Sequence, residues 1–304
     1  MSTFKQAKIA LDENRMSILG VQVLYGFQLN APFQPQFASL PAVSKDASLA
    51  AFLLLTAAIV VMIAPSGYHR IVTDGTSTSR LQTGITWATS CTLGLLGAAM
   101  ALDLFLVGEQ IGGTAVGIGL GIAFALCAFL FWFGIELMHR SNRTHTPRDE
   151  EPSSKVKLSE RIDFVLTEAR VVLPGVQALL GFQLIVVLTD AFAALPAGPA
   201  QVHLAALAAV ALSAVLLIAP AAHHRIVYRG GDSPDFPPIA SAYLLAATVF
   251  LALGMAADCY VIVLKVLESD VWAVTAAIVT TLLCLCFWHL FPLLGRYRRR
   301  PVHG

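Results

Sequence analysis

Six polar side chains stand inside long apolar stretches of the 304-residue chain, where such groups are rare. Four are glutamines and two are aspartates: Gln22, Gln28, Gln177, Gln183, Asp103 and Asp258. A neutral amide can coordinate an alkali cation but cannot exchange a proton. A carboxylate inside a membrane segment is costly and is therefore a candidate for a proton relay or a cation site. The pattern predicts a polar pathway along the glutamines and a cation or proton site at the aspartates.

Each of these groups also has a purely structural interpretation. The glutamines would join helices, because neighbouring glycines allow close approach and amides hydrogen-bond across the interface. Asp103 and Asp258 would lie about 27–29 Å along helices that rise from the cytoplasm, close to the outer boundary of the membrane. A carboxylate at that depth can reach water or headgroups. The sequence leaves both interpretations open.

Two His-Arg pairs occupy corresponding places near the ends of the second and sixth apolar stretches. They are His69-Arg70 and His224-Arg225. Cationic side chains at the carboxyl end of a helix favour its dipole and the anionic inner leaflet. The alternatives are a pH sensor, a metal pair or axial haem ligands, and haem fits least because the residues lie at helix ends. We predict a pH-sensing or lipid-facing role for the four residues and expect no cofactor.

The sequence contains no enzyme motif. It lacks a phosphate-cradling loop, an HExxH or GxSxG motif, and a dinucleotide fingerprint following a strand. The run Gly117, Gly119, Gly121 lies inside an apolar stretch and predicts close helix packing. All five cysteines lie in apolar stretches and predict small packing residues in place of a disulfide or zinc site. We therefore expect no catalytic residue and no metal.

The composition points to a membrane protein. The chain is 57% hydrophobic and 13% charged, about half the charged share of a soluble globular domain. A spanning helix needs roughly 20 mainly apolar residues. Eight stretches qualify: 15–33, 48–66, 84–107, 114–138, 169–192, 203–221, 239–264 and 271–294. Turn residues support the breaks between them, and Pro65 and Pro220 are expected to end the second and sixth spans.

The charges predict the orientation of these spans. A polar linker, 139–161, separates the fourth and fifth stretches. Placing it together with both termini and the loops 67–83 and 222–238 puts every lysine and arginine except Lys45 and Lys265 on one side. By the positive-inside rule that side is the cytoplasm. A basic cluster in the carboxyl tail is expected to bind anionic lipid of the inner leaflet; it consists of Arg296, Arg298, Arg299 and Arg300.

The chain aligns with itself at an offset of 155 residues. Residues 13–29 and 168–184 share ten identities in 17 positions without a gap. The same offset places Leu40-Pro41 on Leu195-Pro196 and Asp103 on Asp258. Each half holds four spans, so both halves enter the membrane from the same side. This predicts two parallel repeats related by a pseudo-two-fold axis along the membrane normal.

The segments TEARVVLPGVQALLGFQL and IAPAAHHRIV resemble the core of a bacterial family of small four-span membrane proteins known only as a domain of unknown function. The resemblance implies a tandem fusion of two such units, and some relatives carry the label sodium:proton antiporter. It is clear over the second half and weaker over the first. The chain departs from the pattern at Tyr68, which falls on His223 of the second half.

These observations define our expectations. The fold is an all-α integral membrane protein of eight transmembrane helices, with repeats at 1–138 and 162–304, in a bacterial inner membrane with both termini cytoplasmic. The function is transport or permeation of a small inorganic cation or proton through the repeat interface. The alternative is a non-transporting structural or regulatory module that binds lipid or a partner protein. We expect no nucleic-acid partner, and a homo-oligomer is compatible with the sequence.

Overall fold

The computed structural model describes residues 18–73, 79–130, 132, 158–228 and 233–297, and the regular elements of these residues are all helical. The first is a helix at 18–30. The remaining elements are η1 (Ala31–Phe33), η2 (Pro35–Ser39), α2 (Ala42–Thr73), α3 (Ser79–Gly112), α4 (Thr114–Phe129), α6 (Leu158–Val187), α7 (Asp190–Ala193), α8 (Ala197–Ile226), α9 (Phe236–Leu267), α10 (Asp270–Leu285), the π-helical turn η4 (Cys286–Leu290) and α11 (Phe291–Tyr297). The all-α prediction is confirmed.

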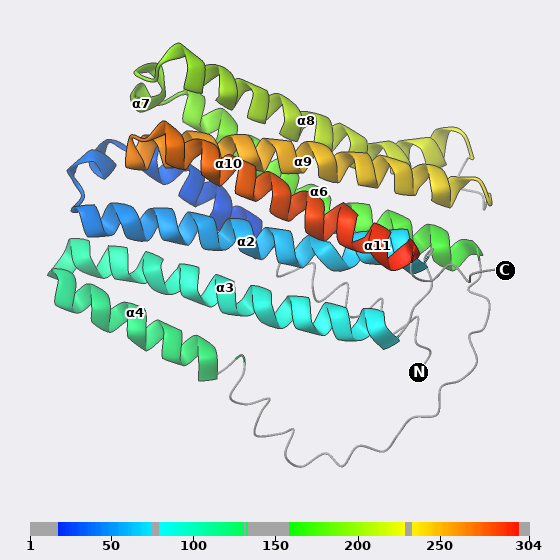
Figure 1. Ribbon diagram of the computed structural model, residues 1–304, viewed down its shortest axis with the longest axis horizontal. Helices are drawn as coiled ribbons and strands as arrows, with labels where there is room; N and C mark the ends of the chain where they lie inside the picture. The colour runs from blue at the N-terminus through cyan, green and yellow to red at the C-terminus, as the bar shows by residue number, and fades with distance from the viewer. Residues whose placement is uncertain (1–17, 74–78, 131, 133–157, 229–232, 298–304) are drawn as a thin grey trace, which may run out of the picture.

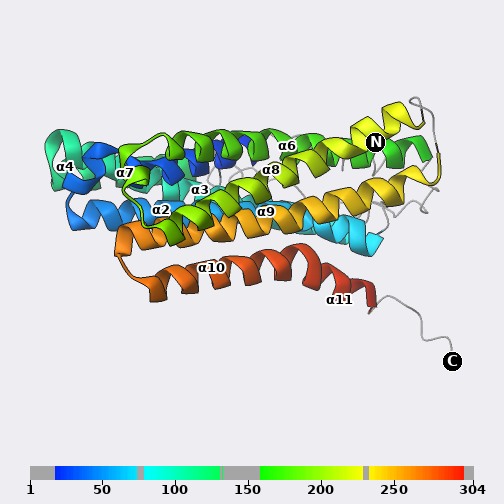
Figure 2. The same ribbon diagram turned by 90° about the horizontal axis from the view of Figure 1, so that it is seen from above.

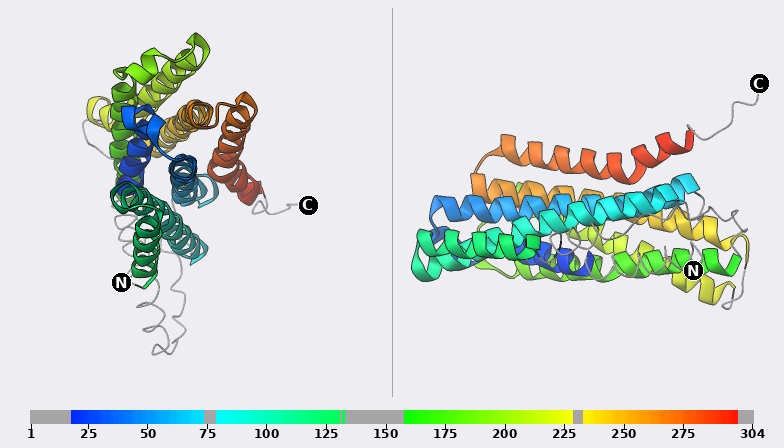
Figure 3. Two further views of the ribbon diagram at one scale, coloured as in Figure 1. Left: turned by 90° about the vertical axis from the view of Figure 1, so that its left-hand side faces the viewer. Right: turned by 90° about the horizontal axis from the view of Figure 1, so that it is seen from below.

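The long helices run side by side along one axis of the molecule, and successive ones point in opposite directions (Figures 1 and 2). Seen end-on, α2 and α9 lie inside the bundle, with α10 on one flank and α3 with α4 on another (Figure 3). Accordingly α9 packs against α8, α10, α6 and α2. Its many buried residues, which include Leu244, Met255 and Ile262, make it the central helix of the core.

Six helices of the described residues are long and apolar enough to cross a membrane: 42–65, 87–112, 161–187, 197–224, 236–267 and 270–295. They correspond to six of the eight expected spans. The other two expected spans, the first and the fourth, extend into residues outside the described ranges; their described helical parts are 18–30 and Thr114–Phe129. Large apolar side chains such as Leu126, Val271 and Trp272 stand exposed on the outside of the bundle. Such a surface is typical of a membrane protein.

Pro65 ends the second apolar span, as expected, whereas the sixth span continues past Pro220 to His224. Pro65 lies inside α2, which continues to Thr73, and Pro220 lies inside α8, which continues to Ile226. Pro174 is likewise inside α6. Proline removes one backbone hydrogen bond, but in an apolar environment the rest of the helix has no other way to satisfy its backbone groups. The helices continue through their prolines, and both project beyond the apolar stretches.

The fifth span also differs from its expected bounds. Helix α6 begins at Leu158, so the last residues of the expected linker are helical, and it ends at Val187. The chain then turns, and Thr189 caps the short helix α7 by accepting a hydrogen bond from the Phe192 N–H at 3.2 Å. A capping threonine and Asp190 in the first turn favour a new helix start over continuation.

Several helix bounds repeat at the offset found in the sequence. Helices α2 and α8 begin 155 residues apart, at Ala42 and Ala197, and α3 and α9 end 155 residues apart, at Gly112 and Leu267. The residues that follow these two ends, Gly113 and Glu268, have positive φ angles of 82° and 49°. Glycine adopts such a backbone freely, whereas glutamate does so at a cost. The two turns share a positive φ but differ in ψ, which is 176° at Gly113 and 34° at Glu268.

The glycines at 117 and 121 allow α4 to lie directly on α3. A Cβ on Gly117 would stand 2.6 Å from the Phe105 carbonyl oxygen, and one on Gly121 would stand 2.9 Å from that of Ala101. Gly119, between them, faces open space. The prediction of close helix packing is confirmed for the two outer glycines of the run.

Candidate functional site

The first aspartate is held by a glutamine from another helix. Gln28, near the end of the helix at 18–30, donates a hydrogen bond from Nε2 to a carboxylate oxygen of Asp103 on α3. Ser48 on α2 donates from Oγ to Gln28 Oε1 at 3.0 Å. Gln28 and Ser48 are buried, and Asp103 is partly exposed. Three helices therefore contribute to one chain of hydrogen bonds that ends on the carboxylate.

The second aspartate is held in the same way and is fully buried. Gln183 on α6 donates from Nε2 to Asp258 Oδ2 on α9 at 2.8 Å. His203 on α8 lies beside both, with Nε2 3.1 Å from the backbone oxygen of Gln183 and Nδ1 3.9 Å from Asp258 Oδ1. Gln183, His203 and Asp258 are all 0% exposed. We call these three residues the α9 cluster.

The two sites correspond residue by residue at the 155-residue offset. Gln28 corresponds to Gln183, Asp103 to Asp258, and Ser48 to His203. Ser48 and His203 occupy the same position in their helices, six residues after the first residue of α2 and of α8. The sites differ in the third residue, which is a hydroxyl in one and an imidazole in the other. Only the α9 cluster brings two titratable side chains together.

Three polar atoms of the α9 cluster lack a hydrogen-bond partner. They are Gln183 Oε1, His203 Nδ1 and Asp258 Oδ1. Buried polar atoms are normally paired, and an unpaired one costs about 1–3 kcal/mol. Three such atoms in one fully buried cluster mark a site with the capacity to bind a proton or a small polar species.

The burial of Asp258 disagrees with the structural interpretation in which its carboxylate reaches water or headgroups. Its side chain is enclosed by α6, α8 and α9 and does not reach water or headgroups. Depth along the helix alone suggested an interfacial acid, but burial also depends on which face of the helix packs against its neighbours. Asp103 does reach the surface in part. The polar pathway and the acidic site were predicted as separate features. Two of the glutamines, Gln28 and Gln183, in fact each form a site together with an aspartate.

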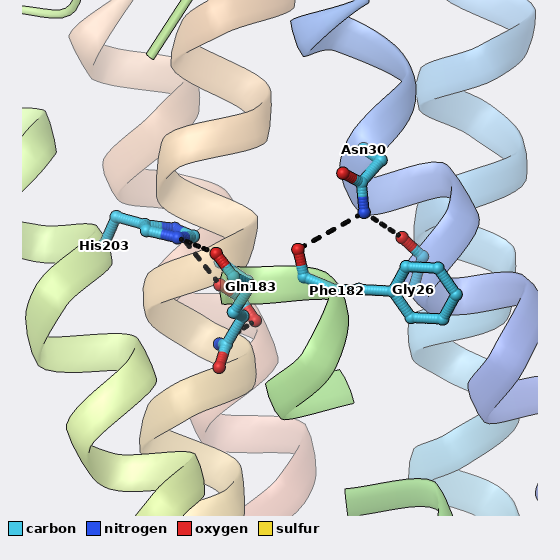
Figure 4. A network of polar contacts seen from close by, with 6 residues as sticks. Gly26, Asn30, Phe182, Gln183 and His203 are labelled. Atoms are coloured by element: carbon cyan, nitrogen blue, oxygen red, sulfur yellow. Dashed lines mark hydrogen bonds and ion pairs between the residues drawn. The ribbon is translucent and has the colours of Figure 1, made fainter. Parts of the chain in front are cut away.

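The helix at 18–30 and α6 lie in contact. Asn30 donates from Nδ2 to the Gly26 carbonyl at 3.0 Å and to the Phe182 carbonyl at 3.4 Å (Figure 4). Phe27 and Phe182, which correspond at the 155-residue offset, have ring centroids 4.9 Å apart. Because Phe182 precedes Gln183, these bonds connect the helix at 18–30 to the α9 cluster through the α6 backbone.

Gln22 and Gln177 have different environments despite their similar sequence surroundings. Gln22 is buried, with its amide resting on Gly175 of α6, and its Oε1 lacks a hydrogen-bond partner. Gln177 is exposed on the outside of the described bundle. The expected pathway along all four glutamines is therefore not assembled: two bind aspartates, one packs at the interface and one faces outward.

The His-Arg pairs are only partly described. His69, Arg70 and Arg225 lie in the last turns of α2 and α8, and their side chains fall outside what the structure describes. The His224 ring packs on the Phe236 ring, with ring centroids 4.7 Å apart. The Nε2 atom of His224 is buried and lacks a hydrogen-bond partner. The predictions for Arg296 and for residues 298–300 likewise fall on side chains or residues outside the described set.

Three residues of these sites were not predicted as functional from the sequence: His203, Ser48 and Asn30. A usable signal was present for two of them, because the 155-residue offset places a polar residue of one half on a polar residue of the other at Ser48 and His203. Within the described residues no group of three or more His, Cys, Asp or Glu is arranged to hold a metal.

Comparison with known proteins identifies the family. A family model matches two segments of the chain, residues 6–136 and 151–292, and is described as a family of unknown function, DUF6328. The two matches are consistent with one domain present twice in tandem. No curated protein and no solved structure matches the chain. Since the matched segments cover most of its length, the chain belongs to the DUF6328 family.

Proposed function

We propose that this chain is an eight-span membrane protein made of two parallel four-helix repeats, 1–138 and 162–304, joined by a cytoplasmic linker at 139–161. The 155-residue spacing of the helix bounds and of the two Gln–Asp sites supports the repeats. The distribution of lysine and arginine supports cytoplasmic termini in a bacterial inner membrane. The four arginines of the tail bind anionic lipid in this arrangement.

The proposed activity is movement of a small inorganic cation or a proton across the membrane, with Asp103 and Asp258 as the acidic sites. One observation carries the proposal: Asp258 is completely buried and is held by a glutamine and a histidine from two other helices. Burying a carboxylate in a membrane protein costs free energy, so a buried one is a candidate functional residue. The matching Gln28–Asp103 bond provides a second acidic site at the equivalent position of the other half.

A second candidate function is a non-transporting module that binds lipid or a partner protein. The packing of the glutamines favours it, because Gln28 and Gln183 are hydrogen-bonded within the protein and Gln22 rests against Gly175. Amides used in this way hold helices together for about 0.6–2 kcal/mol each. The two functions differ in whether any ion crosses the bundle.

Ion flux in proteoliposomes separates the two candidates. The full chain is reconstituted with a pH dye inside, and sodium, potassium or proton gradients are imposed. Transport predicts flux that Asp258→Asn abolishes and Asp103→Asn reduces. The control is Asp46→Asn, which changes an exposed aspartate in the first part of α2 and should leave flux unchanged. If liposomes that contain the wild-type protein pass no more of any cation than empty liposomes, transport is excluded. The non-transporting module is then the function that remains.

A further inference from the structure

The backbone of Gln183 determines which nitrogen of His203 carries a hydrogen. His203 Nε2 lies 3.1 Å from the Gln183 carbonyl oxygen. A carbonyl oxygen only accepts hydrogen bonds, so Nε2 must be the donor and must be protonated. In a neutral imidazole the other nitrogen, Nδ1, then carries a lone pair.

That lone pair faces the carboxylate of Asp258. Nδ1 and Asp258 Oδ1 are 3.9 Å apart, and neither atom has a hydrogen-bond partner. Gln183 Nε2 donates to the other carboxylate oxygen, Oδ2, and so fixes the orientation of the carboxyl group. If His203 were neutral and Asp258 ionised, two acceptors would face each other in a fully buried site.

A single proton between the two residues removes this conflict. It gives either an imidazolium beside a carboxylate or an imidazole beside a carboxylic acid, and both arrangements have no net charge. With no proton, the cluster carries a buried negative charge; with two protons, it carries a buried positive charge. An unpaired buried charge costs several kcal/mol even after the protein relaxes.

Within the part of the chain that the structure describes, no permanently charged side chain forms an ion pair with Asp258. Two other titratable groups interact electrostatically with Asp258: Tyr25 from the helix at 18–30 and the neighbouring Cys259. Cys284 of α10 interacts in turn with Cys259. All three are neutral in their usual forms at neutral pH. The ring of Phe192 packs edge-on against the His203 ring, with the two ring centroids 5.2 Å apart. Among the described residues, His203 is the basic side chain that lies within ion-pair distance of Asp258, at 3.9 Å.

We infer that His203 and Asp258 form a one-proton site, which holds a single shared proton at neutral pH. This deepens the proposed function, because it assigns the proton as the ion bound by the second half. The corresponding site of the first half has Ser48 in place of His203 and therefore has no second titratable group for a shared proton. The two halves thus differ in the ion chemistry of otherwise equivalent sites.

The proton can be counted directly on the full chain in lipid vesicles at neutral pH. Nitrogen-15 NMR of histidine-labelled protein, assigned with His203→Ser, reports whether His203 Nδ1 is protonated. Infrared spectroscopy reports whether Asp258 is protonated, through a carboxylic-acid C=O band that Asp258→Asn removes and Asp103→Asn leaves in place. We expect one of the two signatures and not both.

Neither signature, or both together, would overturn the one-proton site. If Asp258→Asn does not fold, aspartate labelled with carbon-13 identifies the carboxylic-acid band in the wild-type chain, and His203→Ser should shift that band. Failure of this inference is distinct from failure of the proposed function. A shared proton without ion flux leaves the site intact and removes transport, whereas flux without a shared proton keeps transport and removes the site.

Discussion

Ser48 and His203 stand at the same position of α2 and α8, yet they approach their glutamines differently. The Ser48 hydroxyl donates to the side-chain oxygen of Gln28, whereas His203 bonds the backbone oxygen of Gln183. As a result Gln28 uses both ends of its amide, while the side-chain oxygen of Gln183 has no hydrogen-bond partner. In the first site both ends of the glutamine amide are therefore hydrogen-bonded within the protein. In the α9 cluster the amide oxygen of Gln183 is still able to accept a hydrogen bond.

Replacing His203 by serine should give the α9 cluster the same three residue types as the first site, with one titratable side chain in place of two. In His203→Ser the cluster retains Gln183 and Asp258 but loses the imidazole, so the shared proton has no second residue to occupy. We expect proton-dependent flux in proteoliposomes to fall to the level of empty vesicles and its variation with pH to disappear. Ser213→Ala is the control on the same helix, because it removes one neutral hydrogen bond, from Ser213 Oγ to the Ala247 carbonyl, worth about 0.5–1.5 kcal/mol and no titratable group. A wild-type pH profile in His203→Ser would contradict this expectation.

Helix packing at α4 gives a prediction independent of function. Gly117→Ala places a Cβ against the backbone of α3, which cannot move aside as a flexible side chain would, and should destabilise the protein by about 1–3 kcal/mol. The measurement is thermal or denaturant unfolding in detergent. Gly119→Ala, two residues away and facing open space, should be neutral or stabilising by up to about 1 kcal/mol through helix propensity. Equal effects of the two changes would refute this account of the α3–α4 contact.

A buried indole attaches the carboxyl end of the bundle to α2. Trp288, 1% exposed in the π-helical turn, donates from Nε1 to the Val60 carbonyl at 2.8 Å. Trp288→Phe removes the donor and leaves a space, and we expect a loss of about 2–4 kcal/mol in unfolding free energy. Trp272→Phe provides the comparison, because Trp272 is 61% exposed and its replacement should change stability by less than about 0.5 kcal/mol. A stability loss in Trp272→Phe matching that of Trp288→Phe would show that the Val60 bond is not the cause.

The sequence predicts the helices well because hydrophobicity is a local property. The ends of the apolar stretches and the ends of the helices need not coincide, as Pro65 and Pro220 demonstrate. A proline ends a helix in water, where the freed backbone groups are solvated, but it is tolerated where apolar surroundings leave no other partner. Helices α2 and α8 nevertheless extend beyond their apolar stretches, to Thr73 and Ile226, which hydrophobicity alone does not indicate.

The sites are harder to predict because their bonds join distant residues. Gln28 and Asp103 are 75 residues apart, as are Gln183 and Asp258. The internal alignment shows that both members of each pair recur together, but it does not show that they touch. It also fails to distinguish Gln22 from Gln177, which lie in nearly identical sequences. Only the packing of the helix at 18–30 on α6 buries the first and exposes the second.

The order of residues in the two sites bears on how the protein is made. Gln28 and Ser48 precede Asp103 in the chain, and Gln183 and His203 precede Asp258. A ribosome therefore delivers each acid only after the amide that will bind it has already been synthesised. The acid-bearing helix can join partners already in the bilayer, and its carboxyl group need not face lipid alone. Biosynthesis from the amino terminus and assembly of the polar sites thus proceed in the same order.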